Sequence, residues 1–273
     1  MELMARAELA DFAVGRMGIA RGHSIDRREV GLLFSSDADV AAQAAGFFGA
    51  FAAIHSFFGF DNQRMRELLP KACRGAVFFH PFRPAAEGHI AAAYLREVTA
   101  GHATFNPEPA AAKLDLLTAD LDLARRLADA HGVGPGRFVL LMPGSGSPAK
   151  NWPAANYLQL AGELSRYCPV LTVLGPAENN LQATFSRLVT IVNPPLGALA
   201  GLARISAAFV GNDSGVSHLA AAAGARGVVI FGPTDPARWR PLGAVSVVRR
   251  MPLRDLCWRD VAQALEALPK CAE

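Results

Sequence analysis

Short apolar runs that alternate with helical patterns are the feature that most constrains the fold of this chain. The clearest run is Val228-Val229-Ile230-Phe231. Central strands of a parallel sheet are buried on both faces, so they read as continuous apolar segments. The pattern therefore predicts an α/β protein with parallel sheets. The predicted strands are Val30–Phe34, Ala52–Phe58, Gly75–His80, Phe138–Met142, Val170–Leu174, Leu188–Val192, Ala208–Val210, Gly227–Phe231 and Val245–Val248.

The chain is long enough for two domains. It has 273 residues, and domains usually have about 150. Pro107 and Pro109 forbid regular helix in the stretch Gly101–Ala112. We therefore predict an N-terminal domain over residues 1–110 and a C-terminal domain over residues 111–273.

Composition excludes several classes of protein. Apolar residues make up 51% of the chain and charged residues 19%, which excludes disorder. The formal net charge is only +3, and basic residues occur in pairs at most, as in Arg249-Arg250, so we expect no nucleic-acid partner. The four cysteines form no CxxC pair, which leaves zinc-ribbon and thioredoxin-like interpretations without support.

The stretch Val40–Phe60 carries no formal charge and is long enough to span a bilayer. Its Ala and Gly content and polar residues such as Gln43 favour a buried helix over Ala38–Phe48, followed by a short buried strand over Ala52–Phe58. Near the N-terminus, charged residues such as Glu2 and Arg6 interrupt the apolar run that a secretory signal would need. The predicted compartment is therefore the cytoplasm.

One loop after a predicted strand, Pro143–Pro153, has features that suit a phosphate. Its small residues let backbone N–H groups approach a ligand, and the helix predicted to open near its end adds unpaired donors and positive partial charge. Lys150 supplies a full charge, and the hydroxyls of Ser145 and Ser147 can donate. The spacing of a Walker loop is absent, and an ordinary turn with a surface lysine is the alternative.

A second loop, Gly211–Ala220, also joins a strand to a helix. Asp213 and Ser214 are good helix N-caps, so capping is the alternative to ligand binding for each of them. His218 lies one helical turn after Ser214 and on the same face, although a buried structural histidine is the alternative there.

Two further loops follow predicted strands. Phe231–Pro236 is a rigid Gly-Pro and Asp-Pro loop, and Glu178 places a carboxylate that could accept hydrogen bonds from ribose hydroxyls. Solvent exposure is the alternative for Glu178. Because ligands bind beyond the carboxyl ends of strands in open α/β sheets, the four loops together predict a nucleotide-diphosphate site.

At these residues the sequence resembles the family 9 glycosyltransferases, the ADP-heptose:lipopolysaccharide heptosyltransferases and their relatives. The segments that carry the resemblance are Pro143–Pro153, Gly211–Ala220 and Phe231–Pro236, with Glu178 between them. The resemblance implies a GT-B-like architecture, in which two Rossmann-like domains with parallel sheets face each other. It also implies that the C-terminal domain holds the nucleotide sugar and that the final helix, predicted over Asp260–Leu268, packs back toward the N-terminal domain.

The resemblance implies an inverting transfer of a sugar, heptose from ADP-heptose, to a lipopolysaccharide-core or related glycan acceptor. The protein would need no cofactor, would bind no metal, and would make peripheral contact with the inner face of the plasma membrane. Asp120-Leu121-Asp122 lies on a predicted helix, away from strand ends, and is not expected to be a metal motif. The implied donor-binding residues are Ser145, Gly146, Lys150, Glu178, Asp213, Ser214, Gly215 and His218.

The opening segment of the family is not found in this sequence. Family members begin with a strand, a Gly-Asp turn and a helix, and the aspartate there is the expected base; here Asp11 lies in a helical pattern with no predicted strand before it. We therefore predict that the N-terminal domain is incomplete, without the first β-α-β unit, and we assign no catalytic base. His55, His80 and His89 are candidates for a replacement base, with structural or exposed histidines as the alternative.

Three interpretations of function stay open at this stage. In the first, the true start lies upstream and the protein is a glycosyltransferase. In the second, the protein has lost the base and binds a nucleotide sugar without turnover. The third is a GT-B-fold epimerase that acts on a nucleotide sugar.

Overall fold

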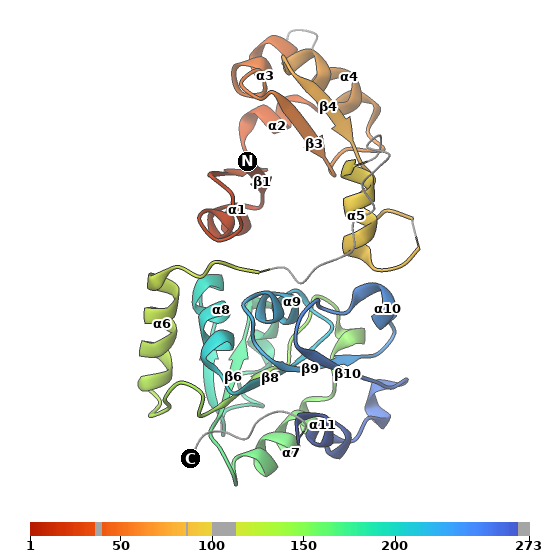
Figure 1. Ribbon diagram of the computed structural model, residues 1–273. Helices are drawn as coiled ribbons and strands as arrows, with labels where there is room; N and C mark the ends of the chain where they lie inside the picture. Colours follow the sequence, from red (N-terminus) through yellow and green to blue (C-terminus); the bar gives the residue numbers. More distant parts are fainter. Residues whose placement is uncertain (36–39, 86, 100–112, 267–273) are drawn as a thin grey trace. The chain divides into compact units, whose positions relative to one another are not determined.

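The computed structural model describes residues 1–35, 40–85, 87–99 and 113–266, and the chain divides into two compact units (Figure 1). Unit 1 comprises Met1–Pro109 and unit 2 comprises Ala110–Glu273. The stretch Gly101–Ala112, where we predicted the domain boundary, lies outside the described residues.

In the part of the chain that the structure describes, unit 2 is built on a six-stranded parallel sheet with the order β10-β9-β8-β5-β6-β7. The strands are β5 (Val139–Met142), β6 (Val170–Leu174), β7 (Val189–Val192), β8 (Ala208–Asn212), β9 (Gly227–Phe231) and β10 (Val245–Arg249). The helices are α6 (Thr118–Asp129), α7 (Ala154–Leu164), α8 (Leu196–Ile205), α9 (Gly215–Ala222), α10 (Pro236–Trp239) and α11 (Trp258–Glu266). The strand order reverses between β5 and β8, and ligands bind in open α/β sheets at such a switch point.

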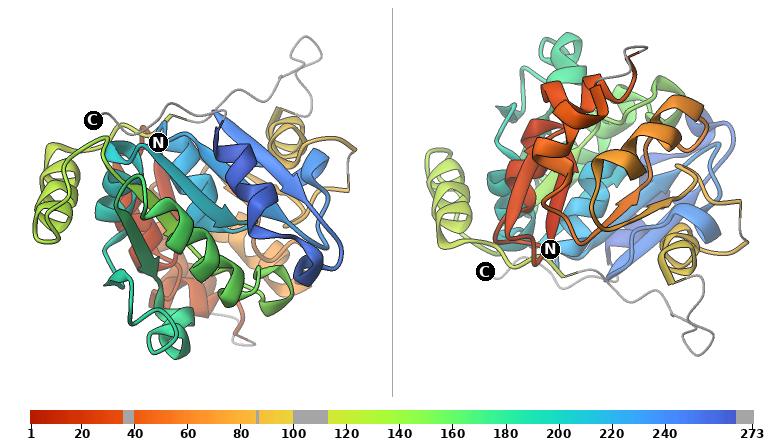
Figure 2. Two further views of the ribbon diagram at one scale, coloured as in Figure 1. Left: turned by 90° about the horizontal axis from the view of Figure 1, so that it is seen from below. Right: turned by 90° about the horizontal axis from the view of Figure 1, so that it is seen from above.

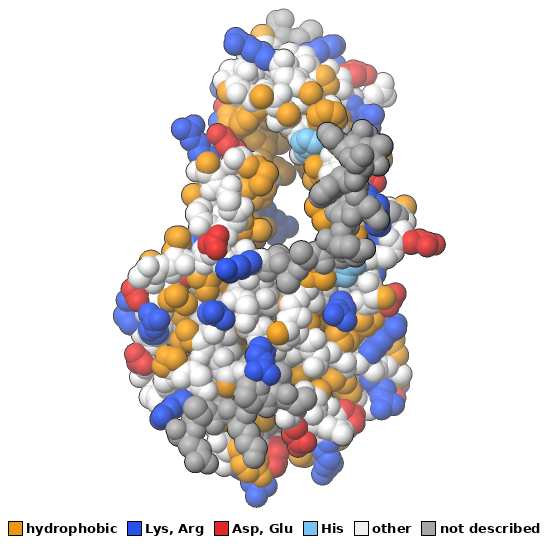
Figure 3. All heavy atoms as spheres, in the orientation of Figure 1, with side chains coloured by type: hydrophobic (Ala, Val, Ile, Leu, Met, Phe, Trp, Pro, Cys, Tyr) orange, Lys and Arg blue, Asp and Glu red, His pale blue; other side chains and the backbone are white. Residues whose placement is uncertain are grey.

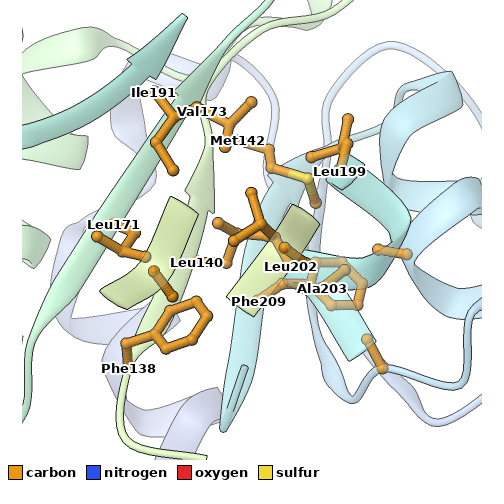
Figure 4. Close-up of a cluster of buried hydrophobic side chains, with 14 of the residues drawn as sticks. Phe138, Leu140, Met142, Leu171, Val173, Ile191, Leu199, Leu202, Ala203 and Phe209 are labelled. Atoms are coloured by element: carbon orange, nitrogen blue, oxygen red, sulfur yellow. The ribbon is translucent and has the colours of Figure 1, made fainter. Parts of the chain in front are cut away.

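Two hydrophobic cores cover the two faces of this sheet, because successive side chains of a strand point to opposite faces. Leu140 of β5 and Phe209 of β8 face α6, α8 and α9, in the core drawn in Figure 4. Leu141 of β5 and Val210 of β8 face the opposite way, toward α7 and α11. Helices α7 and α11 lie side by side on that face (Figure 2). All the strands predicted between residues 138 and 248 are confirmed, and burial on both faces explains the continuous apolar runs of the central strands β5, β6, β8 and β9.

The last described helix belongs to the core of unit 2. Val261 and Leu265 of α11 are buried among residues of α7 and the sheet. The helix ends at Glu266, so Ala267 and Leu268 of the predicted helix lie outside the described residues.

Among the residues of unit 1 that the structure describes, β1 pairs with β2 and β3 pairs with β4, each pair running parallel. The core of this unit gathers apolar residues from α2, α3 and α4, with Met4 of β1 and Ile54 of β3 packed against it. The strands are β1 (Glu2–Ala5), β2 (Arg21–Ser24), β3 (Ala53–Ser56) and β4 (Ala76–Phe79). The helices are α1 (Ala7–Ala13), α2 (Arg28–Leu32), α3 (Val40–Phe48), α4 (Gln63–Ala72) and α5 (Ile90–Thr99).

Two predictions for the N-terminal part of unit 1 are wrong. The predicted strand Val30–Phe34 is mostly helix, since α2 covers Arg28–Leu32; Val30 and Leu33, spaced as on one helix face, are the buried residues of the run. A strand also precedes Asp11, although none was predicted there. Strand β1 leads directly into α1, the helix that contains Asp11, and β1 pairs with β2. That the N-terminal domain lacks the first β-α-β unit of the family stays a prediction.

The apolar stretch Val40–Phe60 divides as the sequence indicates. Helix α3 covers Val40–Phe48 and strand β3 covers Ala53–Ser56, while Ala38 lies outside the described residues. The prediction that this strand is buried is wrong, because its residues alternate between exposed and half-buried. No helix among the described residues combines the length and the hydropathy that crossing a bilayer requires.

Candidate functional site

An ion pair joins two loops at the point where the strand order of unit 2 reverses. The Nζ atom of Lys150, in the loop after β5, lies 2.7 Å from Oδ2 of Asp213, which directly follows β8. The hydroxyl of Thr234, in the loop after β9, donates to the same Oδ2 at 2.6 Å. The Asp213 side chain is 5% exposed and the Lys150 side chain 31% exposed, so a buried carboxylate holds a cation that solvent can still reach. Three of the predicted loops therefore meet here.

Asn212, the last residue of β8, fixes the loop after β5. Its Nδ2 group donates to the carbonyl oxygen of Pro143 at 2.7 Å, and its Oδ1 accepts from the backbone N–H of Trp152 at 3.1 Å. The hydroxyl of Tyr157 donates to the same oxygen at 3.1 Å. Burial raises the pKa of Tyr157 above its ordinary value, which keeps this hydroxyl protonated. The two ends of the loop are thus tied to the strand that carries Asp213.

Glu178 is buried against the start of the same loop rather than exposed to solvent. Its Oε2 accepts the backbone N–H of Gly175 at 2.9 Å, and the residue is 8% exposed. A Cβ atom at Gly144 would overlap the Glu178 carboxyl group, so a larger residue there would have to displace that carboxylate. The loop after β6 therefore joins the other three at one edge of the sheet.

The remaining residues of the first loop form a tight polar turn. The hydroxyl of Ser145 lies 2.7 Å from the carbonyl oxygen of Ser147 and 2.6 Å from Oδ1 of Asn151. Gly146 is exposed, and a Cβ atom at this position would meet nothing within 4 Å. Packing inside the described structure does not require a glycine there.

The second loop opens helix α9 without a side-chain cap. Ser214 occupies the N-cap position, but its hydroxyl makes no capping hydrogen bond and lies 3.4 Å from the hydroxyl of Ser217. Asp213 is held by Lys150 and Thr234, so capping does not account for its carboxylate.

Gly215 and His218 complete the predicted set. Gly215 is the first residue of α9 and is exposed, and a Cβ atom there would likewise meet nothing within 4 Å. His218 lies inside α9 and is half-buried. Its role as a donor ligand stays a prediction.

The sequence does not single out three residues that hold the site together: Gly144, Asn212 and Thr234. The sequence pattern places Asn212 only within the second loop and Thr234 only within a rigid loop. Their common signal is position, because each lies at or within three residues of the carboxyl end of a central strand. That position alone is enough to nominate them.

The Asp-x-Asp segment lies on a helix, as expected. Asp120 accepts the backbone N–H of Leu117 at 2.9 Å, and Asp122 pairs with Arg125 at 3.1 Å. Within the described ranges, no group of three His, Cys, Asp or Glu side chains is arranged to hold a metal ion. On the face of unit 2 seen in Figure 3, Lys and Arg side chains are spread among neutral and acidic ones.

The fold and this loop cluster define an α/β protein with a polar site at the switch point of a parallel sheet. The family model "Glycosyltransferase family 9 (heptosyltransferase)" matches residues 87–257, and the chain belongs to that family. The parallel α/β fold is that of the GT-B heptosyltransferase structures.

Individual relatives agree with this assignment. Lipopolysaccharide heptosyltransferase 3 of Escherichia coli is 30% identical over 147 residues, which cover 48% of this chain and 43% of that protein. The chain thus aligns with less than half of the length of this relative.

Solved structures share the fold at low identity. The E. coli ADP-heptose lipopolysaccharide heptosyltransferase II superposes with a TM-score of 0.74 at 18% identity, covering 97% of this chain and 88% of that one. A family 9 glycosyltransferase from Veillonella parvula gives 0.70 at 18% identity, covering 87% and 77%. The E. coli heptosyltransferase WaaC with ADP gives 0.68 at 18% identity, covering 97% and 89%.

Proposed function

We propose that this chain is a metal-independent, inverting glycosyltransferase that moves heptose from ADP-heptose to a lipopolysaccharide-core or related glycan acceptor. The observation that carries the proposal is the contact of the Asp213 carboxylate with both Lys150 and Thr234 at the switch point of the unit 2 sheet. The names of the similar structures support the choice of donor, since one is described with ADP and another as an ADP-heptose enzyme.

Lys150 has the geometry to bind a diphosphate while it keeps its partner. An ammonium group has three N–H donors, and Asp213 accepts one of them. The others are available to phosphate oxygens, with which a lysine forms charge-assisted hydrogen bonds. The N-termini of α7 and α9, neither with a side-chain capping bond, add backbone donors beside it. Together these groups would stabilise the charge that develops on the leaving diphosphate.

The two exposed glycines support close approach of a ligand. Neither Gly146 nor Gly215 has a positive φ or a near neighbour that would exclude a side chain. A glycine is expected where a backbone must come close to a ligand. We therefore place both residues at the donor, together with Ser145 and Ser214. Glu178 is proposed near the nucleoside, and His218 is proposed to line the donor site.

Unit 1 is proposed as the acceptor-side domain. The proposed setting is the cytoplasm, with peripheral contact at the inner face of the plasma membrane, where a lipopolysaccharide-core acceptor would be presented. No cofactor or nucleic-acid partner is proposed.

Incubation with ADP-heptose and a truncated lipopolysaccharide acceptor, with ADP release as the readout, tests the proposal. We expect ADP release that depends on the acceptor. Calorimetric binding without release would favour a nucleotide-sugar-binding protein, and conversion of the donor without an acceptor would favour an epimerase.

Lys150→Ala tests the phosphate contact. We expect the affinity for ADP-heptose to weaken by about 1.5–3 kcal/mol, because a charge-assisted hydrogen bond is lost. Lys113→Ala, which removes an exposed lysine of the same unit, is the matched control and should leave affinity unchanged. Unchanged affinity in Lys150→Ala would contradict the assignment.

Asp213→Asn and a pair of glycine variants separate binding from folding. Asp213→Asn should reduce donor binding or turnover while it changes the melting temperature little.

Gly146→Ala should keep the melting temperature and weaken donor affinity about tenfold, roughly 1.4 kcal/mol. Gly144→Ala should lower the melting temperature, because its Cβ would displace Glu178. Equal behaviour of the two glycine variants would remove the ligand-based reason for Gly146.

A further inference from the structure

Two histidines meet at the carboxyl end of the strand pair β3 and β4 in unit 1. Nδ1 of His55 lies 3.0 Å from Nε2 of His80. The ring planes differ by 3° and the ring centroids are 5.2 Å apart. Since the nitrogen atoms are much closer than the centroids, the rings meet edge to edge in nearly one plane. One hydrogen atom is therefore shared along the line between them.

Neighbouring groups hold the two rings in place. Backbone N–H of His80 donates to the carbonyl oxygen of Ser56 at 2.8 Å, which extends the register of the strand pair. Phe78 stacks on His55 with centroids 4.8 Å apart, and Phe57 stacks on His80 at 4.9 Å. Two strands and the loop after β3 thus fix the geometry.

The third member of the cluster is a carboxylate from α5. Oε2 of Glu97 lies 4.0 Å from Nδ1 of His80, on the side away from His55. A carboxylate on that side favours the tautomer of His80 with its hydrogen on Nδ1. Nε2 of His80 must then accept, so Nδ1 of His55 donates. The outer nitrogen of His55, Nε2, is left with a lone pair.

The exposure of His55 and the charges around the histidine pair suit His55 to accept a proton. His55 is exposed, whereas His80 is 6% exposed. Burial lowers the pKa of His80, the charge of His55 lowers it further, and Glu97 opposes both. Among the described residues that face His80, the titratable groups are thus His55 from β3 and Glu97 from α5; the hydroxyl of Tyr94, also from α5, donates instead to the carbonyl of Phe82. A neutral His80 can accept from His55 and share its charge once His55 is protonated.

We propose that His55, positioned by His80 and Glu97, is the general base that deprotonates an acceptor hydroxyl bound at this edge of unit 1. The inference rests on the proposed transferase function. The proton of the hydroxyl moves to Nε2 of His55, and the oxygen forms the new bond to the anomeric carbon of the donor sugar. The bond from that carbon to the diphosphate breaks, and its electron pair leaves with the nucleoside diphosphate. His55 is the catalytic residue, and His80 and Glu97 are positioning residues.

The first test is the kinetics of His55→Gln with ADP-heptose and the acceptor. We expect kcat to fall by about 10²–10⁴-fold, the usual contribution of a general base, with unchanged calorimetric affinity for ADP-heptose. The decline of kcat/KM on the acid side should disappear with the base. His131→Gln, which removes an exposed histidine of unit 2, is the control and should keep wild-type kinetics. A His55→Gln variant with a kcat within twofold of wild type would overturn the proposal.

Glu97→Gln provides a test that does not remove the base. Without the negative charge of Glu97, the protonated form of the His55–His80 pair is less stable. The acid-side decline of kcat/KM should therefore move to lower pH, while KM for the donor stays unchanged. Nitrogen-15 NMR of the histidine rings should show His55 with its hydrogen on Nδ1. The opposite tautomer, or an unmoved pH profile, would contradict the relay.

The outcomes also separate this inference from the proposed function. If the wild-type chain binds ADP-heptose but transfers nothing to the acceptor, the base assignment is overturned and the donor site stands. If the chain binds no nucleotide sugar, the proposed function fails as well.

Discussion

The strands of the two units differ in how much of their surface is buried. In unit 2, every residue of β5, β6, β8 and β9 is buried. In unit 1, β3 and β4 alternate between exposed and half-buried residues, so within the described residues one face of this pair remains accessible. The unit 2 sheet therefore positions its site through packing, whereas the unit 1 strands carry polar chemistry on an accessible face.

The largest expected effect on stability comes from replacing a buried phenylalanine of unit 2, and an exposed phenylalanine of unit 1 provides the comparison. Phe209 on β8 is 0% exposed and Phe78 on β4 is 46% exposed. Phe209→Ala should lower the free energy of unfolding of unit 2 by about 3–5 kcal/mol, because it leaves a cavity in a core that cannot collapse freely. Phe78→Ala should cost unit 1 less than about 1 kcal/mol. Urea denaturation followed by hydrogen exchange resolves each unit, and equal losses would contradict the difference in burial.

A buried polar residue of unit 2 gives the next effect. Asn212→Ala would remove the hydrogen-bond partner of the Pro143 carbonyl, the Trp152 backbone N–H and the Tyr157 hydroxyl. We expect it to lower the free energy of unfolding by about 2–4 kcal/mol. Asn179→Ala, at an exposed position, is the control and should change stability by less than about 0.5 kcal/mol. Urea denaturation measures both, and a neutral Asn212→Ala would show that water replaces the lost partner.

A pH effect should distinguish unit 1. Burial lowers the pKa of His80 below its ordinary 6.5, so the unfolded chain binds this proton more readily than the folded one. The stability of unit 1 should therefore be highest above pH 6.5. It should fall as pH drops from 6.5 toward the lower pKa of His80 in the folded state, by at most about 1.4 kcal/mol per pH unit for one proton. His80→Gln should flatten the dependence between pH 7 and 5, measured as urea midpoints. An unchanged slope would exclude His80 as its source.

The smallest effect concerns a half-buried ion pair in unit 1. The Arg27 guanidinium, 2.9 Å from Glu29, lowers the pKa of that carboxyl from 4.5 to about 2. Its stabilising effect should be present above pH 4.5 and disappear as pH falls toward 2. Because solvent screens the pair, Glu29→Gln should shift the acid-unfolding midpoint only slightly, and added salt should abolish the shift. Circular dichroism during acid titration measures it, and a large salt-independent shift would contradict this account.

The sequence predicted the regions in which burial dictates composition. The central strands of unit 2 are buried on both faces, and the loops that hold Lys150 and Asp213 could be found because they follow two of those strands, β5 and β8. Strands β1 and β2 were missed because they contain residues such as Arg21 and Gly22 in place of a β-branched run. Gly22 is there because a Cβ would overlap the Ala10 carbonyl region of α1, a contact that sequence spacing does not show.

Contacts between distant residues were the other limit. His55 and His80 are 25 residues apart, and their hydrogen bond depends on the register of two strands and the rotamers of both rings. The pairing of Thr234 with Asp213 spans 21 residues and likewise depends on neighbouring strands. Residue type nominated both histidines, but only the folded backbone could join them.

The bonds that Asn212 makes to both ends of the loop after β5 have a thermodynamic consequence. The backbone there is already ordered before any ligand enters, so association has little chain freedom left to remove. Any ligand that binds this loop should thus lose little conformational entropy of the chain, and the backbone amide of Trp152, which donates to Asn212, should exchange its hydrogen slowly with or without a bound molecule.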